Sequence, residues 1–446
     1  MTTNNFGQKL RSLRLQRGLS QNDLAEPGLS AGYISLLENG KRPPTSEVIL
    51  RIAARLDVSP EVLSSAQEAS VRPLVSENAA SGYATQVALL RGDLAFADGD
   101  ISAAYDMFAA ALDNAVQSAA DRMQAVHRLA HACEQLGELD RAAELYRQWL
   151  ELHQQQHHPS GWVHTWLVCA TSLTRCMLEL GQLDQAVDFG VESLARARAL
   201  GVRGIPPAVE LASSVQYARH CGGGGGRSDI DSGAVEEAAT RFLSRDVQVE
   251  AYSQAAQAAE ENGDQESAYA LLVEAFQTKV MDTRAVAGDR IAVTVMAHVS
   301  HQGGPLPAQL QLEVRPAVQR LQEFGTAVDA SLGAAGFANI LLNSGESEEA
   351  HRTAADALAI MPAAYRLSRA QTALTAGRAL RELGQYKQAR DSYESASTQL
   401  IDMGLGWLGA NALFELAEML EQEGDSSGAL SVYRTASKTL RVPRGT

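Results

Sequence analysis

The sequence predicts an all-α protein in two parts: a small N-terminal domain of short helices, followed by a long array of paired helices. Three observations support this fold class. Signals that start and stop helices follow one another closely over residues 6–64. A pattern of glycine, alanine and an aromatic residue then recurs from Gly99 to Gly424. Hydrophobic residues make up 45% of the 446 residues and aromatic residues only 5%, a balance that suits closely packed, alanine-rich helices.

Five short helices are expected within residues 6–64, because each is bounded by residues that begin or end helices. A small polar residue of the kind that caps helix N-termini precedes four of them, namely Ser20, Ser30, Thr45 and Ser59. Asp23 follows Ser20 by three residues and is expected to complete a capping box with it. The expected helices are residues 6–17, a brief helix that stops at Pro27-Gly28, residues 31–38, residues 46–56, and one beginning at Pro60.

Two short helices joined by a tight turn that contains glycine form a helix-turn-helix. The segment LSQNDLAEPGLSAGYISLLENGKRPP resembles the lambda-repressor-like, or Xre-type, DNA-binding family in the order and spacing of its residues. The matching elements are Ser20-Gln21, Leu24-Ala25, Gly28, Ser30, Tyr33-Ile34-Ser35 and Glu38 to Pro43. The resemblance implies a five-helix DNA-binding domain in residues 1–66 and a role in transcriptional regulation. A helix-turn-helix retained only for protein contacts is the alternative.

Residues 31–38 are the expected recognition helix, whose N-terminal part faces base edges in the major groove. The positions expected to face the bases are Ala31, Gly32, Ser35 and Leu36. None is Arg, Asn or Gln, the side chains that make bidentate base contacts, so sequence readout is expected to depend on DNA shape. Contacts to phosphates are expected from Gln21, Tyr33, Asn39, Lys41 and Arg42. Tyr33 has a packing role as its alternative, and Ile34 and Leu37 are expected in the core.

The distribution of charge separates the same two parts. The whole chain has a formal net charge of -15, which argues against a general nucleic-acid binder. Residues 1–60 nevertheless hold eight basic and five acidic side chains, a net of +3, so the remainder carries -18. A basic head on an acidic body is typical of a DNA-reading module joined to a domain that does not bind DNA.

Beyond residue 77 the pattern Gly-x-x-x-x-Ala-x-x-x-aromatic-x-x-Ala recurs. Strong copies begin at Gly99, Gly137, Gly384 and Gly424, with weaker ones at Gly181, Gly263 and Gly345 and degenerate ones at Gly233 and Gly303-Gly304. The pattern resembles tetratricopeptide repeats (TPRs), somewhat longer than the usual length. The resemblance implies a right-handed superhelix of about nine helix pairs over residues 78–440, with the glycine in the turn of each pair.

Three segments are expected outside the packed helices. Residues 67–77 are interpreted as a linker, and residues 441–446 as a tail. Residues 222–232 include a run of glycines that cannot hold a helix, so they are expected to form a loop within one repeat. A phosphate-binding loop is the alternative, but no GKS or GKT follows the glycines.

The first helices of TPR pairs form the concave wall of the superhelix, so polar side chains at their inward positions are candidates for ligand contact. The candidates are Arg175, Gln257, Arg290, Asn339, Asn343, Arg378 and Phe414. Arginine suits a peptide carboxylate, and asparagine suits a peptide backbone. The alternative for each is a side chain that merely solvates the wall.

The combination of an Xre-type domain with a TPR array resembles the cytoplasmic peptide-pheromone receptors of Gram-positive bacteria, the Rgg and PlcR group. This resemblance implies quorum sensing by a homodimer that binds operator DNA and a signalling peptide. A small-metabolite effector is a second possibility. A TPR interaction scaffold that the helix-turn-helix tethers to DNA is a third.

Other functions find little support in the sequence. No Ser-His-Asp or paired-carboxylate arrangement indicates an enzyme. His153 and His157 have the spacing of a metal pair, but no further ligand completes it, so neither a metal nor a cofactor is expected. No apolar run is long enough for a transmembrane helix, and the polar N-terminus does not resemble a signal peptide. We therefore expect a cytoplasmic protein without membrane contact.

Overall fold

The computed structural model describes residues 6–58 and 77–441, with internal gaps. The gaps are residues 8–9, 12, 15–16, 18, 22, 26–28, 30, 39–41, 43, 57, 116–117, 155–161, 223–234, 236–237, 239–240, 281 and 304–307. The proposed linker up to residue 76, residues 223–232 of the glycine-rich segment and tail residues 442–446 lie outside the described residues. The chain forms two compact units, Met1–Glu77 and Asn78–Thr446, and each is described by itself.

The N-terminal unit is built of short helices around a small apolar core. Its two best-defined helices are α2 (Ala31–Glu38) and α3 (Ser46–Arg55), which confirm two of the expected segments to within one residue. The core contains Phe6, Leu10, Leu24, Leu29, Ile34, Leu37, Ile52 and Leu56.

Two of the four predicted caps, Ser20 and Thr45, form hydrogen bonds, and the other two, Ser30 and Ser59, lie outside the described residues. The Ser20 amide donates to Asp23 Oδ2 over 2.6 Å, and the Asp23 amide donates to Ser20 Oγ over 3.2 Å, which is the reciprocal pair of a capping box. Thr45 Oγ1 accepts from the Val48 amide over 3.4 Å at the start of α3. The expected helix start at Thr45 is therefore confirmed, whereas the described residues after Ser20 form a turn.

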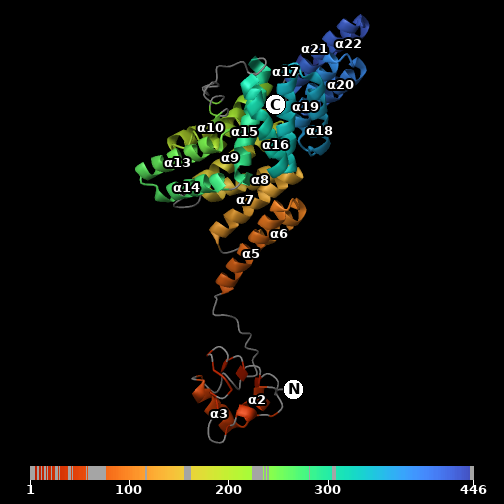
Figure 1. Cartoon of the computed structure of the whole chain (residues 1–446). Helices are drawn as coiled ribbons and strands as arrows, with labels where there is room; N and C mark the ends of the chain where they lie inside the picture. Colours follow the sequence, from red (N-terminus) through yellow and green to blue (C-terminus); the bar gives the residue numbers. More distant parts are fainter. Residues whose placement is uncertain are drawn as a thin grey trace. The chain divides into compact units, whose positions relative to one another are not determined.

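The C-terminal unit is an array of paired helices, and every regular element within its described residues is a helix (Figure 1). Eight pairs can be followed in those residues. They are α5 (Glu77–Ala97) with α6 (Ile101–Asn114), α7 (Ala119–Leu136) with α8 (Leu139–Gln154), α9 (Val163–Glu179) with α10 (Leu183–Ala199), α13 (Arg245–Glu261) with α14 (Gln265–Val280), α15 (Asp282–Gly303) with α16 (Ala308–Phe324), α17 (Ala327–Asn343) with α18 (Ser347–Ile360), α19 (Arg366–Glu382) with α20 (Tyr386–Asp402), and α21 (Gly406–Glu423) with α22 (Ser426–Arg441). Helix α11 (Pro206–Cys221) precedes the partly described residues 235–241.

The repeat motif has the structural role that its residue types predict. The glycines at 99, 137, 181, 263, 345, 384 and 424 all have φ between 70° and 89°, the left-handed region that other residues avoid. The alanine and aromatic positions are buried, as Ala104 with Phe108 and Ala389 with Tyr393 show. Gly303 ends α15 instead, and Gly233 and Gly304 lie outside the described residues.

Two features of the array do not follow from the repeat. Helix α11 packs directly against α15, while the α13–α14 pair lies to the side and its α14 contacts α9 and α15. The array also contacts itself over long sequence distances, because Tyr365 Oη donates to the carbonyl oxygen of Glu134 over 3.2 Å. None of the helices within the described residues is both long enough and apolar enough to cross a membrane.

Candidate DNA-binding surface and effector cavity

Helix α2 presents one face to the core and the other outward. Ile34, Leu37 and Glu38 are buried, whereas Gly32 and Leu36 are exposed. Ala31, Tyr33 and Ser35 are partly exposed beside them. The residues expected to face DNA bases thus share a surface that the domain core does not cover, which a recognition helix requires.

The expected phosphate contacts divide into three groups. Gln21 donates through Nε2 to Glu38 Oε2 over 2.7 Å, so its amide is engaged within the domain. The guanidinium of Arg42 lies 5.9 Å from the centroid of the Tyr33 ring, within the range of a cation–π contact. Asn39 and Lys41 lie outside the described residues.

Glu38 has a structural role that the motif did not reveal. Its carboxylate accepts from Arg14 Nε over 2.7 Å and Nη2 over 3.1 Å, and both side chains are buried. Burial opposes the charge of Glu38, but the bonds from Arg14 and Gln21 outweigh it and hold the pKa of this carboxyl below its usual range. The last residue of α2 is therefore tied to the first helical segment, which fixes the orientation of the recognition helix.

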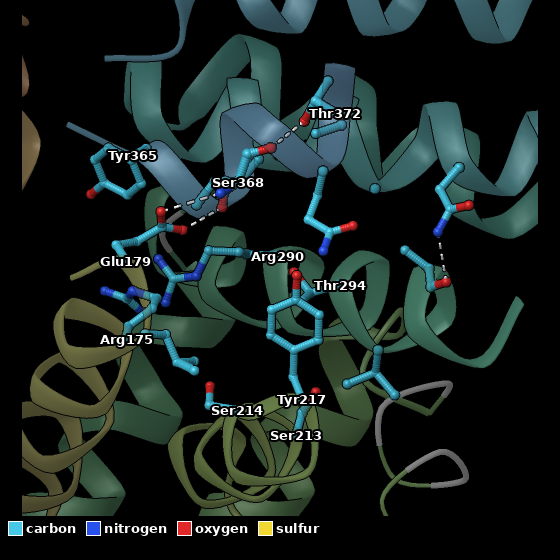
Figure 2. A pocket seen from close by; sticks show the side chains of 18 of the residues that line it. Arg175, Glu179, Ser213, Ser214, Tyr217, Arg290, Thr294, Tyr365, Ser368 and Thr372 are labelled. Atoms are coloured by element: carbon cyan, nitrogen blue, oxygen red, sulfur yellow. Dashed lines mark hydrogen bonds between the residues drawn. The ribbon is translucent and has the colours of Figure 1, made fainter. Parts of the chain in front are cut away.

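A cavity of about 180 Å³ lies in the C-terminal unit, lined by residues of five helices, α9, α11, α15, α17 and α19, and by Tyr365 just before α19. Figure 2 shows Arg175, Glu179, Arg290 and Tyr365 gathered at one end, with Ser213, Ser214 and Tyr217 of α11 on another wall. Leu178, Ile291, Val295 and Leu332 add apolar surface. A mixed lining with convergent polar groups is what small-molecule and peptide sites share.

The structure brings together four of the seven candidate effector residues at this cavity: Arg175, Arg290, Asn339 and Arg378. Asn343 lies one helical turn after Asn339, and its Nδ2 donates to Asn339 Oδ1 over 3.3 Å. Phe414 packs against Tyr433 with ring centroids 6.1 Å apart. Gln257 is exposed on α13, because that helix does not join the wall where α11 meets α15.

Five charged residues, one from each of five helices, form a chain of alternating charge, and three of them line the cavity. Arg175 of α9 bonds to Glu134 of α7 through Nε over 3.0 Å, and to Glu210 of α11 through Nη1 over 2.6 Å. Arg290 of α15 bonds to Glu210 over 3.0 Å and to Asp329 of α17 over 2.8 Å. We call Glu134, Arg175, Glu210, Arg290 and Asp329 the ion ladder.

The ion ladder contains two arginines and three carboxylates, so the negative charges outnumber the positive ones by one. Burial opposes ionisation of Glu210 and Asp329, but the neighbouring Arg290 outweighs it and lowers the pKa of both carboxyls. Arg378 is likewise bound by both carboxylate oxygens of Glu415, over 2.8 and 2.7 Å. Each of these arginines is therefore ion-paired with carboxylates of the protein. The cavity does not carry the strong positive charge that binding a polyanion would require.

One donor of the ion ladder is left over. The Nε–H of Arg290 is buried and has no hydrogen-bond partner among the described residues. A buried donor without a partner costs about 1–3 kcal/mol.

Glu179 stands at the end of the cavity where α9 meets the start of α19. Its carboxylate accepts from the backbone amides of Leu367 and Ser368 over 3.0 and 3.2 Å, and also from the Ser368 hydroxyl. Burial raises the pKa of this carboxyl to about 7, although these hydrogen bonds act in the opposite direction. Sequence reasoning missed Glu179, because its partners lie 188 and 189 residues away.

Comparisons with known proteins place two recognised families on the chain. A helix-turn-helix family model matches residues 10–63, and a tetratricopeptide repeat model matches residues 125–158. The HTH-type transcriptional regulator PrpR of Mycobacterium tuberculosis is 44% identical over 64 residues, which are 14% of this chain and 13% of that protein. The uncharacterized HTH-type transcriptional regulator RghRB of Bacillus subtilis is 39% identical over 95 residues, which are 20% of this chain and 68% of RghRB.

Solved structures that match the chain include two complexes. A Rap protein complexed with competence and sporulation factor matches with a TM-score of 0.41 and 11% identity, over 80% of this chain and 98% of that one. PlcR of Bacillus thuringiensis in complex with the peptide PapR7 and DNA matches with a TM-score of 0.24 and 13% identity, over 78% and 99% of the two chains.

Proposed function

Because this chain belongs to the Xre-type helix-turn-helix transcriptional regulators, we propose that it binds operator DNA as a homodimer and that an effector in the array cavity controls this binding. The helix α2 surface around Gly32, Ser35 and Leu36 enters the major groove. Arg42 contacts phosphates together with Asn39 and Lys41. With few base-reading side chains on α2, specificity comes from DNA shape and from the spacing of two half-sites.

The observation that carries the effector proposal is the cavity itself. It is lined by five helices that come together from distant parts of the array, and it holds Asn339, whose amide donates to the Ala297 carbonyl over 3.1 Å. Structural repeats need only an apolar seam between neighbours, so a polar cavity at this place calls for a ligand. We place the effector contacts at Arg175, Arg290, Asn339 and Arg378.

The chemistry of the cavity favours a neutral, amide-rich ligand. Its arginines are already paired with carboxylates, while hydroxyl and amide groups such as Ser213 and Gln371 also line it. The cavity, of about 180 Å³, takes part of a signalling peptide or a small metabolite, and we favour the peptide.

A second candidate function is supported by an exposed apolar stripe on α14. Tyr269, Leu272, Phe276 and Val280 lie on one face of this helix and are between 45% and 71% exposed. An apolar stripe of this kind suits a protein partner. In this alternative the array is an interaction scaffold, and the helix-turn-helix only tethers it to DNA.

One experiment separates the two functions. The full-length protein is titrated onto fluorescently labelled promoter fragments from its own genomic neighbourhood, with and without fractionated peptide and metabolite extracts of its host. We expect at least one fraction to change the apparent Kd for DNA in the wild-type protein but not in Asn339→Ala. If no fraction changes DNA binding, while a protein bound at α14 co-purifies and is lost on Phe276→Ala, the scaffold function stands instead.

A further inference from the structure

The first helix of the array carries an apolar stripe that the described residues of its own unit leave largely exposed. Tyr83, Val87, Leu90 and Leu94 of α5 are 68%, 47%, 62% and 66% exposed. Positions three and four apart lie on the same face of a helix, so the four side chains form one continuous strip. The other face of α5 is packed in the usual way, with Gly92 against the Phe108 ring of α6. We call these four residues the α5 stripe.

The α5 stripe is unusual for its position at the end of the array. Figure 1 shows α5 and α6 at one end of the C-terminal unit and α21 and α22 at the other. Terminal repeats of such arrays need a polar outer face, because no further repeat covers them. Helix α22 largely meets this need with exposed Ser431, Arg434 and Lys438. Helix α5 does not, so its outer face requires a partner.

We propose that the α5 stripe is the contact between two copies of this chain. Its residues are spaced by four, three and four positions, and this order reads the same in both directions. Two antiparallel α5 helices related by a twofold axis therefore place Tyr83 opposite Leu94, and Val87 opposite Leu90, in each half of the contact. A surface that is complementary to itself in this way is what an isologous dimer needs.

The exposed area is of the size that a dimer requires. With roughly 200 Å² for a large side chain, the exposed fractions of the α5 stripe amount to about 490 Å² in each copy and about 970 Å² in the pair. The neighbouring exposed residues Ala84 and Arg91 bring the contact to the about 1,000 Å² expected of a specific interface. The stripe on α14 lacks the symmetric spacing, since its residues follow one another by three, four and four positions. The inference rests on the homodimer that the proposed function includes, and it adds where the two copies meet.

The first test is the mass of the full-length protein in solution, from sedimentation velocity over a range of concentrations. The mass obtained for the wild-type protein should be twice the 47.6 kDa of one chain. Leu90→Arg should raise the dimer dissociation constant at least about 30-fold, because it places two like charges beside the twofold axis. Tyr269→Arg on α14 and Leu430→Arg on α22 are matched controls at 71% and 51% exposure, and they should remain dimers. Unchanged circular dichroism of Leu90→Arg establishes that the fold is intact.

A cross-linking test reports the arrangement directly. The four native cysteines are buried and do not compete. A mixture of Val87→Cys and Leu90→Cys proteins should form a disulfide-linked heterodimer under mild oxidation, whereas Tyr269→Cys protein should stay unlinked. A dimer that survives Leu90→Arg, or one that Tyr269→Arg breaks, overturns the proposed interface and leaves effector-controlled DNA binding standing. A wild-type monomer at all concentrations overturns both the interface and the homodimer of the proposed function.

Discussion

Among single residues, Gly7 carries a requirement that the helix-turn-helix motif does not display. A Cβ atom at this position would lie 2.3 Å from the carbonyl oxygen of Leu37 and 2.6 Å from that of Glu38. Both atoms belong to the backbone at the end of α2 and cannot turn aside. The absence of a side chain at Gly7 thus lets the first helical segment approach the recognition helix.

Gly7→Ala should therefore destabilise the N-terminal unit. We expect a loss of about 1–3 kcal/mol in its free energy of unfolding, as for overpacked core sites. Urea denaturation followed by a probe in this unit measures the change. Leu50→Ala, at a 56% exposed site on α3, should change the same quantity by no more than about 0.5 kcal/mol. Equal stabilities for Gly7→Ala and the wild type would show that the two segments are not this close.

Glu179 gives a prediction about pH. Its pKa is raised from the ordinary value of 4.5 to about 7, so the folded protein holds this proton more tightly than the unfolded chain. Stability from this group is therefore present at low pH and is lost as the pH rises from about 4.5 to about 7, by up to about 3 kcal/mol. Glu179→Gln lacks the ionisation, so its stability relative to the wild type should increase across this window and then level off above pH 7. Thermal unfolding of both proteins between pH 4.5 and 8 tests this, and a constant difference would contradict it.

At the scale of elements, the turns and the inner wall of the array are predictable from sequence to different degrees. The turn glycines at seven positions could be predicted because a left-handed backbone is a local requirement of the turn. The spacing of the repeats also predicts which residues face the inner wall. Four of those residues, Arg175, Arg290, Asn339 and Arg378, line one cavity. The phase failed for Gln257, because the displacement of the α13–α14 pair depends on packing between α11 and α15 and not on the repeat itself.

The segment that follows α2 in the sequence gives a prediction about DNA affinity. Lys41→Ala combined with Arg42→Ala should weaken binding to all DNA sequences alike, because phosphate contacts carry no base information. Each lost contact should reduce the slope of log K against log salt concentration by about 0.9. Fluorescence anisotropy between 50 and 200 mM salt, a range over which phosphate contacts dominate, provides the slope. Lys438→Ala on α22 is the control and should leave it unchanged; an unchanged slope in the double variant would remove these residues from the interface.

Helix α19 gives a prediction about the effector. Arg378→Ala removes a side chain that lines the cavity and is held by Glu415, so it should weaken the response to the effector at least tenfold, about 1.4 kcal/mol. The affinity for DNA without effector should stay the same, because Arg378 belongs to the other unit. Arg390→Ala on α20, whose ion pair with Glu394 is exposed, is the matched control. A loss of basal DNA binding in Arg378→Ala would indicate a folding defect and not effector contact.

At the scale of the whole array, the cavity exists because distant repeats meet. The turn at Gly137 lies close to Pro362 and Ala364, and the turn at Gly181 lies close to the carbonyl oxygen of Met403. No local pattern encodes these contacts, since each joins residues more than 200 positions apart. Periodicity therefore predicts the helices and their order but not the curvature that brings α9 beside α19. That curvature determines the shape of the cavity.

The contact between the start of α19 and the earlier helices α7 and α9 includes two hydroxyl hydrogen bonds that can be removed by mutation. Tyr365→Phe with Ser368→Ala removes two hydroxyl donors, to the Glu134 carbonyl and the Glu179 carboxylate. At about 1 kcal/mol for each bond, local opening should become about 30-fold more frequent and amide hydrogen exchange at the start of α19 correspondingly faster. Tyr433→Phe removes a hydroxyl that bonds to Glu421 at the exposed end of the array, and it should leave this exchange unchanged. An effector that contacts both α9 and α19 should slow the exchange again in the double variant, because a ligand that binds the closed form shifts the equilibrium toward it. Equal exchange in the double variant and the wild type would mean that apolar packing alone closes the array, and that the effector must act by another route.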